Sequence, residues 1–133
     1  MWLPDTNVWI AYFRKAPSSV KTRIVNMPED QLILCDVIKG ELYYGAYKST
    51  RVSENLVRLD TLFSVVRSLP FNNEAAQHFG EIRAYLFSQG TPIGPYDLQI
   101  AAIALAYDLT VVTHNTREFS RVPGLKLEDW EVQ

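Results

Sequence analysis

Short apolar runs that alternate with helical patterns constrain the fold of this chain more than any other feature of its sequence. The strand-like runs lie near Trp2–Leu3, Leu32–Cys35, Val65–Leu69, Leu109–Thr113 and Lys126–Leu127. The segments between them carry apolar residues at helical spacing, and this alternation is typical of an α/β domain with a mostly parallel sheet. Because Pro4 cannot donate a hydrogen bond to a neighbouring strand, we expect it to be the last residue of the first strand.

The clearest helical pattern follows the capping pair Asn72-Asn73 and ends at Gly90. A second helix is predicted from Gly94-Pro95, and its apolar residues are spread around most of its circumference, which indicates a buried helix. Four further helices are predicted over residues 8–13, 20–25, 37–47 and 54–63. No internal repeat or linker-like run divides the sequence, so we expect one domain over residues 1–133.

The composition narrows the class of protein. The single cysteine, Cys35, excludes an internal disulfide and fits a buried thiol in a reducing compartment. No stretch approaches the ~20 apolar residues of a membrane span, and the N-terminus lacks a signal-peptide pattern, so we expect a cytoplasmic protein without a membrane segment. The net charge of −2 does not favour nucleic-acid binding unless bound cations offset the acidic residues.

Four carboxylates, Asp5, Glu41, Asp97 and Glu118, lie where apolar runs give way to turns or helices. The carboxyl ends of parallel strands share one edge of a sheet, so residues far apart in sequence can converge there. Hard oxygen donors without a histidine or cysteine cluster favour Mg²⁺ or Mn²⁺ over Zn²⁺. The pattern therefore predicts a divalent-metal site of the kind that hydrolyses phosphodiesters with metal-activated water.

Each acid also has a structural interpretation when it is considered alone. Asp5 can cap the helix that follows it, and Glu41 can be an ordinary solvated residue of a helix. Asp97 is favoured in the first turn of its helix by the helix dipole, and Glu118 can pair with a neighbouring arginine. The prediction of a shared site therefore depends on the four residues together.

These acids and their neighbours resemble the PIN-domain ribonucleases, and specifically the VapC toxins of type II toxin–antitoxin pairs. The resemblance is carried by Asp5-Thr6-Asn7, Glu41-Leu42 with Gly45, Pro92 to Ala101, Thr113 to Phe119 and Leu125 to Trp130. It implies a PIN-like fold with about five parallel strands flanked by helices. It further implies a Mg²⁺- or Mn²⁺-dependent endoribonuclease that forms a homodimer and is inhibited in a hetero-oligomer with a VapB-type antitoxin.

The resemblance also assigns roles to the acids. Asp5 and Asp97 correspond to the principal metal ligands, and Glu41 completes the first metal site directly or through water. Many relatives have an acid at the position of Asn115, whereas here the acid is Glu118, three residues later. The fourth catalytic and metal position is therefore assigned to Glu118, with Asn115 as the alternative residue for that position.

Several residues around the acids are expected to position them. Asn7, Thr113 and Asn115 correspond to groups that orient the carboxylates. Relatives often have a small hydroxyl residue at the position of Asp36, which we interpret as a helix cap, with a fifth metal carboxylate as the alternative. His114 is interpreted as a loop residue, because a metal-activated water needs no general base.

Aromatic residues offer stacking surfaces for unpaired bases. We interpret Trp9, Tyr43 and Tyr44 as packing or dimer-interface residues, and we leave Tyr96 as a base-stacking candidate.

Other functions compete with an RNase toxin. A PIN nuclease of RNA maturation or decay without an antitoxin and a catalytically inactive PIN binding module both share the fold. A phosphoacceptor receiver domain would need an Asp after the third strand, where the sequence reads Arg67-Ser68-Leu69-Pro70-Phe71, so this class is excluded. The identity of the RNA, the number of bound metals and the identity of the antitoxin are not encoded in any motif.

Overall fold

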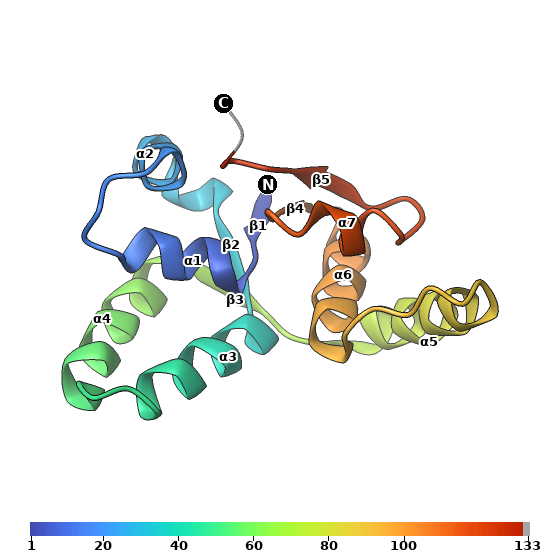
Figure 1. The fold of residues 1–133 in the computed structure, drawn as a ribbon, viewed down its shortest axis with the longest axis horizontal. Coiled ribbons are helices and arrows are strands. Elements are labelled where there is room, and N and C mark those ends of the chain that lie inside the picture. Colours follow the sequence, from blue (N-terminus) through green and yellow to red (C-terminus); the bar gives the residue numbers. More distant parts are fainter. Residues whose placement is uncertain (132–133) are drawn as a thin grey trace.

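Five short parallel strands form the centre of the computed structural model, which describes residues 1–131 (Figure 1). The strands are β1 (Trp2–Pro4), β2 (Ile33–Cys35), β3 (Arg67–Leu69), β4 (Thr110–Val112) and β5 (Lys126–Glu128). One sheet has the order β1-β4-β5, and β2 pairs with β3. A parallel bridge between Trp2 and Leu32 joins the two, so that the combined order is β3-β2-β1-β4-β5. The predicted parallel α/β fold is confirmed.

Pro4 is the last residue of β1, as predicted. The amide of Asp5 donates to the carbonyl of Val112 in β4 at 2.9 Å. Because successive amides of a strand point to opposite sides, the missing N–H of Pro4 falls on the side of β2. The proline therefore removes no hydrogen bond between β1 and β4. Its missing N–H agrees with the observation that a single bridge joins β1 and β2.

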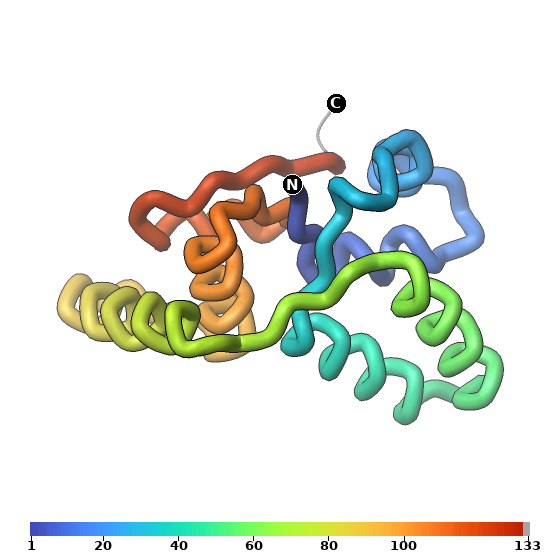
Figure 2. Tube along the Cα trace, turned by 180° about the vertical axis from the view of Figure 1, so that it is seen from behind, coloured from blue at the N-terminus to red at the C-terminus, as the bar shows by residue number. Residues whose placement is uncertain are grey.

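Seven α-helices and one 3₁₀ helix connect the strands in the described part of the chain. They are α1 (Thr6–Phe13), α2 (Ser19–Asn26), η1 (Glu29–Gln31), α3 (Asp36–Tyr47), α4 (Val52–Val65), α5 (Asn73–Ser88), α6 (Pro95–Tyr107) and α7 (Thr116–Phe119). Helices α1 to α4 lie on one side of the strands, and α5 and α6 lie on the other, with β3 crossing between them (Figures 1 and 2). Six of the α-helices match the predicted segments, and α7 was not predicted.

Local sequence signals explain the two helices that pack against each other on that second side. Helix α5 is capped by Asn72, whose side chain accepts from the amide of Ala75 at 2.9 Å, and Gly90 ends the segment with a φ of 69°. Helix α6 buries six consecutive or near-consecutive apolar residues between Leu98 and Ala104, as its uniformly apolar surface predicted.

Cys35 lies fully buried in β2 as a free thiol, and burial raises its pKa to about 12. It therefore behaves as a small apolar core residue, as the sequence suggested. Within residues 1–131, no helix combines the length and the apolar character that a membrane crossing requires.

Candidate active site

The four predicted carboxylates come from four different helical segments or helix ends. Asp5 follows β1 and caps α1, Glu41 lies in α3, Asp97 in the first turn of α6, and Glu118 in α7. The negative charges of the other three raise the pKa of Asp97, so all four act on one region of the molecule. The structure thus brings the predicted residues together, and their role as metal ligands stays a prediction.

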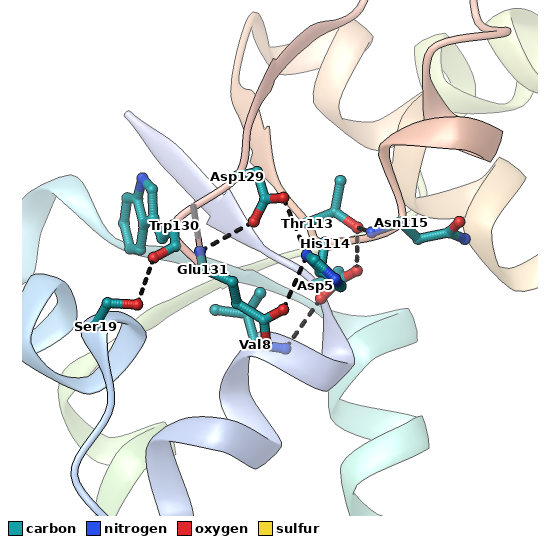
Figure 3. A network of polar contacts seen from close by, with 9 residues as sticks. All are labelled: Asp5, Val8, Ser19, Thr113, His114, Asn115, Asp129, Trp130 and Glu131. Carbon is teal, nitrogen blue, oxygen red and sulfur yellow. Dashed lines mark hydrogen bonds and ion pairs between the residues drawn. The ribbon is translucent and has the colours of Figure 1, made fainter. Parts of the chain in front are cut away.

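Asp5 is buried, and both of its carboxylate oxygens are held in place (Figure 3). Oδ1 accepts from the amide of Val8 at 3.0 Å, which is the helix cap, and Oδ2 accepts from the hydroxyl of Thr113 at 2.6 Å. Burial raises the pKa of Asp5, although these hydrogen bonds favour its charged form. Asp5 therefore caps α1 and also lies in the acidic cluster.

Thr113 and Asn115 continue this network toward Glu118. Thr113 is fully buried at the end of β4, and its hydroxyl also accepts from the amide of Asn115 at 2.9 Å. The side-chain amide of Asn115 donates to Oε2 of Glu118 at 2.8 Å. In this chain the side chain at position 115 thus orients the acid three residues later, and Thr113 orients Asp5.

Glu41 is held by a residue whose role the sequence did not reveal. The hydroxyl of Thr6 donates to Oε1 of Glu41 at 2.7 Å. Asn7 is exposed, and within residues 1–131 its side chain makes no hydrogen bond, so the expected orienting role of its amide is not observed. Its backbone amide instead contributes a hydrogen bond that lowers the pKa of Asp5. The orienting side chain of the Asp-Thr-Asn motif is therefore Thr6.

The pKa of Asp97 is raised well above its usual value. Burial, followed by the negative charges of Asp5, Glu118 and Glu41, together raise its pKa from 3.8 to about 6. A side-chain hydrogen bond with Glu118 raises the pKa of Asp97 as well. At neutral pH a carboxyl with this pKa is mostly ionised, and about one tenth of it is neutral.

The donor set suits a hard divalent cation. Across residues 1–131, no lysine or arginine forms a salt bridge with any of the four acids, so no protein cation offsets their mutual repulsion. Carboxylate oxygens are the ligands that Mg²⁺ and Mn²⁺ prefer, and Mg²⁺ commonly binds through only one or two carboxylates and retains water. The chemistry of these donors therefore suits the expected metal, while within residues 1–131 no three of the four carboxylates have ligand atoms within 4.8 Å of one another.

His114 lies beside this site but belongs to a different cluster (Figure 3). Its Nδ1 lies 3.0 Å from Asp129 and 2.9 Å from Glu131, and their carboxylates raise its pKa. The ligand atoms of these three residues lie within 4.8 Å of one another. The imidazole holds the segment after β5, which agrees with its interpretation as a loop residue.

Two expectations about neighbouring residues need correction or refinement. Asp36 does not cap α3, because the helix begins at Asp36 itself and Cys35 occupies the cap position. The Asp36 carboxylate instead accepts from the hydroxyl of Ser68 at 2.6 Å.

Trp9 is fully buried and Tyr43 packs edge-on against Phe63, so both are packing residues as interpreted. Tyr44 and Tyr96 are exposed, so Tyr44 is not a packing residue within the chain, and its place in a dimer interface stays a prediction.

Comparisons with known proteins agree with this geometry. The PIN domain family matches residues 2–125. The chain is 42% identical over 126 residues to the tRNA(fMet)-specific endonuclease VapC of Shigella flexneri, covering 95% of each, and 33% identical over 132 residues to ribonuclease VapC2 of Rickettsia felis, covering 98% of each. The crystal structure of DNA-bound VapBC from Salmonella typhimurium superposes with a TM-score of 0.90 at 39% identity over 97% of both chains. The chain belongs to the PIN-domain family, and within it to the VapC ribonucleases.

Proposed function

We propose that this chain is a metal-dependent endoribonuclease and the toxin component of a VapBC-like toxin–antitoxin pair. The observation that carries the proposal is the cluster around Asp97, where three further carboxylates raise its pKa and no lysine or arginine of residues 1–131 forms a salt bridge with them. Such a cluster is unfavourable unless a cation joins it. The nuclease names of the VapC relatives supply the reaction class.

The protein supplies ligands and orientation. Asp5 and Asp97 would hold Mg²⁺ or Mn²⁺, with Glu41 and Glu118 as further ligands. When bound, the cation would activate a water for attack on phosphorus and stabilise the leaving oxygen. Thr6 and Thr113 fix the rotamers of Glu41 and Asp5 through hydrogen bonds of 2.7 and 2.6 Å, so the carboxylates need not reorganise. No side chain is required as a covalent nucleophile.

The substrate can be narrowed by the relatives. The Shigella and Salmonella relatives, at 42% and 40% identity, carry the name tRNA(fMet)-specific endonuclease. We therefore infer that initiator tRNA is the first substrate to test for this chain. RNA specificity depends on the surface around the acids, since the metal site recognises only the phosphodiester.

An antitoxin of the VapB type is the proposed inhibitor, because the solved relatives are VapBC complexes. A cavity of about 260 Å³ between α1, α3 and α4 is lined by apolar residues such as Phe13, Leu42 and Leu59 and reaches Glu41. An apolar segment of the antitoxin in this cavity would end beside the acidic cluster. Homodimerisation and a place in the cytoplasm stay predictions.

The test is cleavage of initiator tRNA and of total RNA by purified protein with Mn²⁺, with Mg²⁺ and with EDTA. Fragments that require the cation and that are lost in Asp97→Asn are expected. Asp60→Asn is the matched control, because Asp60 is an exposed residue of α4 outside the cluster and the same charge is removed. Cleavage that persists in EDTA, or equally in both variants, would contradict the proposal.

A further inference from the structure

A groove of about 770 Å³ lies between α3 and the facing ends of α1 and α6. It shares Ile10, Glu41 and Gly45 with the apolar cavity described above, and its other lining residues are different. In Figure 1 the first turn of α6 lies beside the start of α3, and α1 lies above α3. The groove therefore includes Glu41 of the acidic cluster and continues along α3 to Lys48.

One wall of the groove is a single face of α3. Gly40, Tyr44 and Lys48 line it at intervals of four residues, and Glu41 lies one turn before Tyr44. A Cβ atom at Gly40 would meet nothing within 4 Å, so the groove is open directly above the helix backbone at this point.

The opposite wall comes from two other helices. Asn7 lies at the start of α1, and Tyr96 and Gln99 lie one turn apart in α6, directly beside Asp97. Two amide side chains and a tyrosine therefore face the groove from this wall, next to the acids that would hold the metal.

The two tyrosines are unusually exposed for residues beside a catalytic cluster. Tyr44 is 66% exposed and Tyr96 is 59% exposed, whereas the neighbouring Tyr43 packs against Phe63. The ammonium group of Lys48 lies 4.9 Å from the centre of the Tyr44 ring. Exposed aromatic rings together with a positive charge and amide groups are the elements that bind unpaired nucleotides.

We propose that this groove binds an unpaired nucleotide of the RNA next to the phosphate that is cut, with Tyr44 and Tyr96 as stacking surfaces for its base. The side chain of Lys48 contacts the adjoining phosphate, and the amides of Asn7 and Gln99 meet the edges of the base. The inference rests on the proposed function, which it extends to a single-stranded segment as the substrate. RNA is favoured over a protein segment because the groove contains Lys48 and adjoins the phosphodiester site, whereas the apolar cavity is lined mainly by aliphatic and aromatic groups.

The test is a cycle that combines protein and RNA changes. Fluorescein-labelled octaadenylate and an abasic octamer with the same phosphates are titrated with protein in EDTA, so that metal-dependent cleavage does not occur, and binding is read by anisotropy. Tyr44→Ala and Tyr96→Ala are expected to weaken octaadenylate binding about tenfold each and abasic binding much less. Tyr47→Ala is the matched control, since Tyr47 is a 63% exposed tyrosine of the same helix that does not line the groove.

A second variant tests the groove by a change that should not unfold the protein. Gly40→Gln places a side chain into open space and replaces glycine within a helix by a better helix former, so the fold should be retained. It is expected to weaken octaadenylate binding by filling the groove. The folded state of each variant is checked by its thermal transition.

The outcomes separate the groove from the catalytic proposal. Equal losses for both RNAs, or equal losses in Tyr47→Ala, would overturn the groove, even if metal-dependent cleavage of total RNA is found. Unchanged RNA binding with weakened antitoxin binding would identify a protein surface and would also overturn it. A base-dependent loss without cleavage under any metal would support the groove and refute the proposed nuclease.

Discussion

Replacing Asp97 by Asn should stabilise the metal-free protein at alkaline pH while it abolishes cleavage. The fold raises the pKa of Asp97 from 3.8 to about 6, so its ionisation opposes folding. At about 1.4 kcal/mol per pKa unit, the upper bound is ~3 kcal/mol. Two effects reduce the expected gain to ~1–2 kcal/mol. Asp97 is half-buried, so solvent screens its charge, and the variant loses a favourable charge in the first turn of α6 that is worth about 0.3–1 kcal/mol.

The pH dependence follows from the direction of the shift. Between pH 3.8 and about 6 the folded protein binds more protons at Asp97 than the unfolded chain does. The free energy of unfolding of the wild type therefore falls as the pH rises through this interval and stays reduced above it. The advantage of Asp97→Asn should be absent near pH 4 and complete near pH 8.

Thermal unfolding in EDTA at both pH values measures the effect. A gain of ~1–2 kcal/mol in a chain of this size corresponds to a rise in Tm of about 4–7 °C. Adding Mg²⁺ at pH 8 should raise the Tm of the wild type and have little effect on the variant, because ligand binding stabilises the folded state. An equal or lower Tm for the variant at pH 8, or the same advantage at pH 4, would refute the electrostatic reasoning, and Asp60→Asn controls for the change in net charge.

Three further predictions concern residues around the site. Thr113→Val should lower the free energy of unfolding by about 1–3 kcal/mol in urea titrations, because it removes the hydroxyl that donates to Asp5; Thr113→Ser should retain most of the stability. Asn72→Ala should cost ~1 kcal/mol through the lost cap of α5 and leave RNA cleavage unchanged, and a loss of cleavage would mean that the cap supports the site. His114→Gln should destabilise the protein below pH 6.5 but not well above it, because the raised pKa of His114 stabilises the fold only while the imidazole is charged; an altered pH profile of cleavage would instead indicate a general base.

The sequence predicted the helices and strands well where apolar periodicity was long. Helix α5 begins and ends within two residues of the predicted positions, and α6 begins at the predicted Pro95, because Asn72, Gly90 and Pro95 mark these helix ends. Helix α1 begins at Thr6, two residues earlier than predicted, because Asp5 is its cap. Helix α7 has four residues, which is too short for a periodic signal.

The sequence predicted the acids of the site, but it predicted only some of the hydrogen bonds that hold them. Each acid follows a local signal, but the link from Thr6 to Glu41 spans 35 residues and depends on how α1 packs against α3. Likewise, Tyr43 and Tyr44 are adjacent in sequence, and only the rotation of α3 makes one a packing residue and the other exposed. Such distinctions require the tertiary structure.

The hydrogen bond from Thr113 to Asp5 has a consequence for protein synthesis. It joins residues 108 positions apart, and β1 reaches its central place only when β4 pairs beside it. A nascent chain that has emerged only through α6 contains Asp5, Glu41 and Asp97 but lacks the strand that orients the first of them. The growing polypeptide would therefore pass most of its time on the ribosome without an assembled nuclease site, although it is surrounded there by RNA.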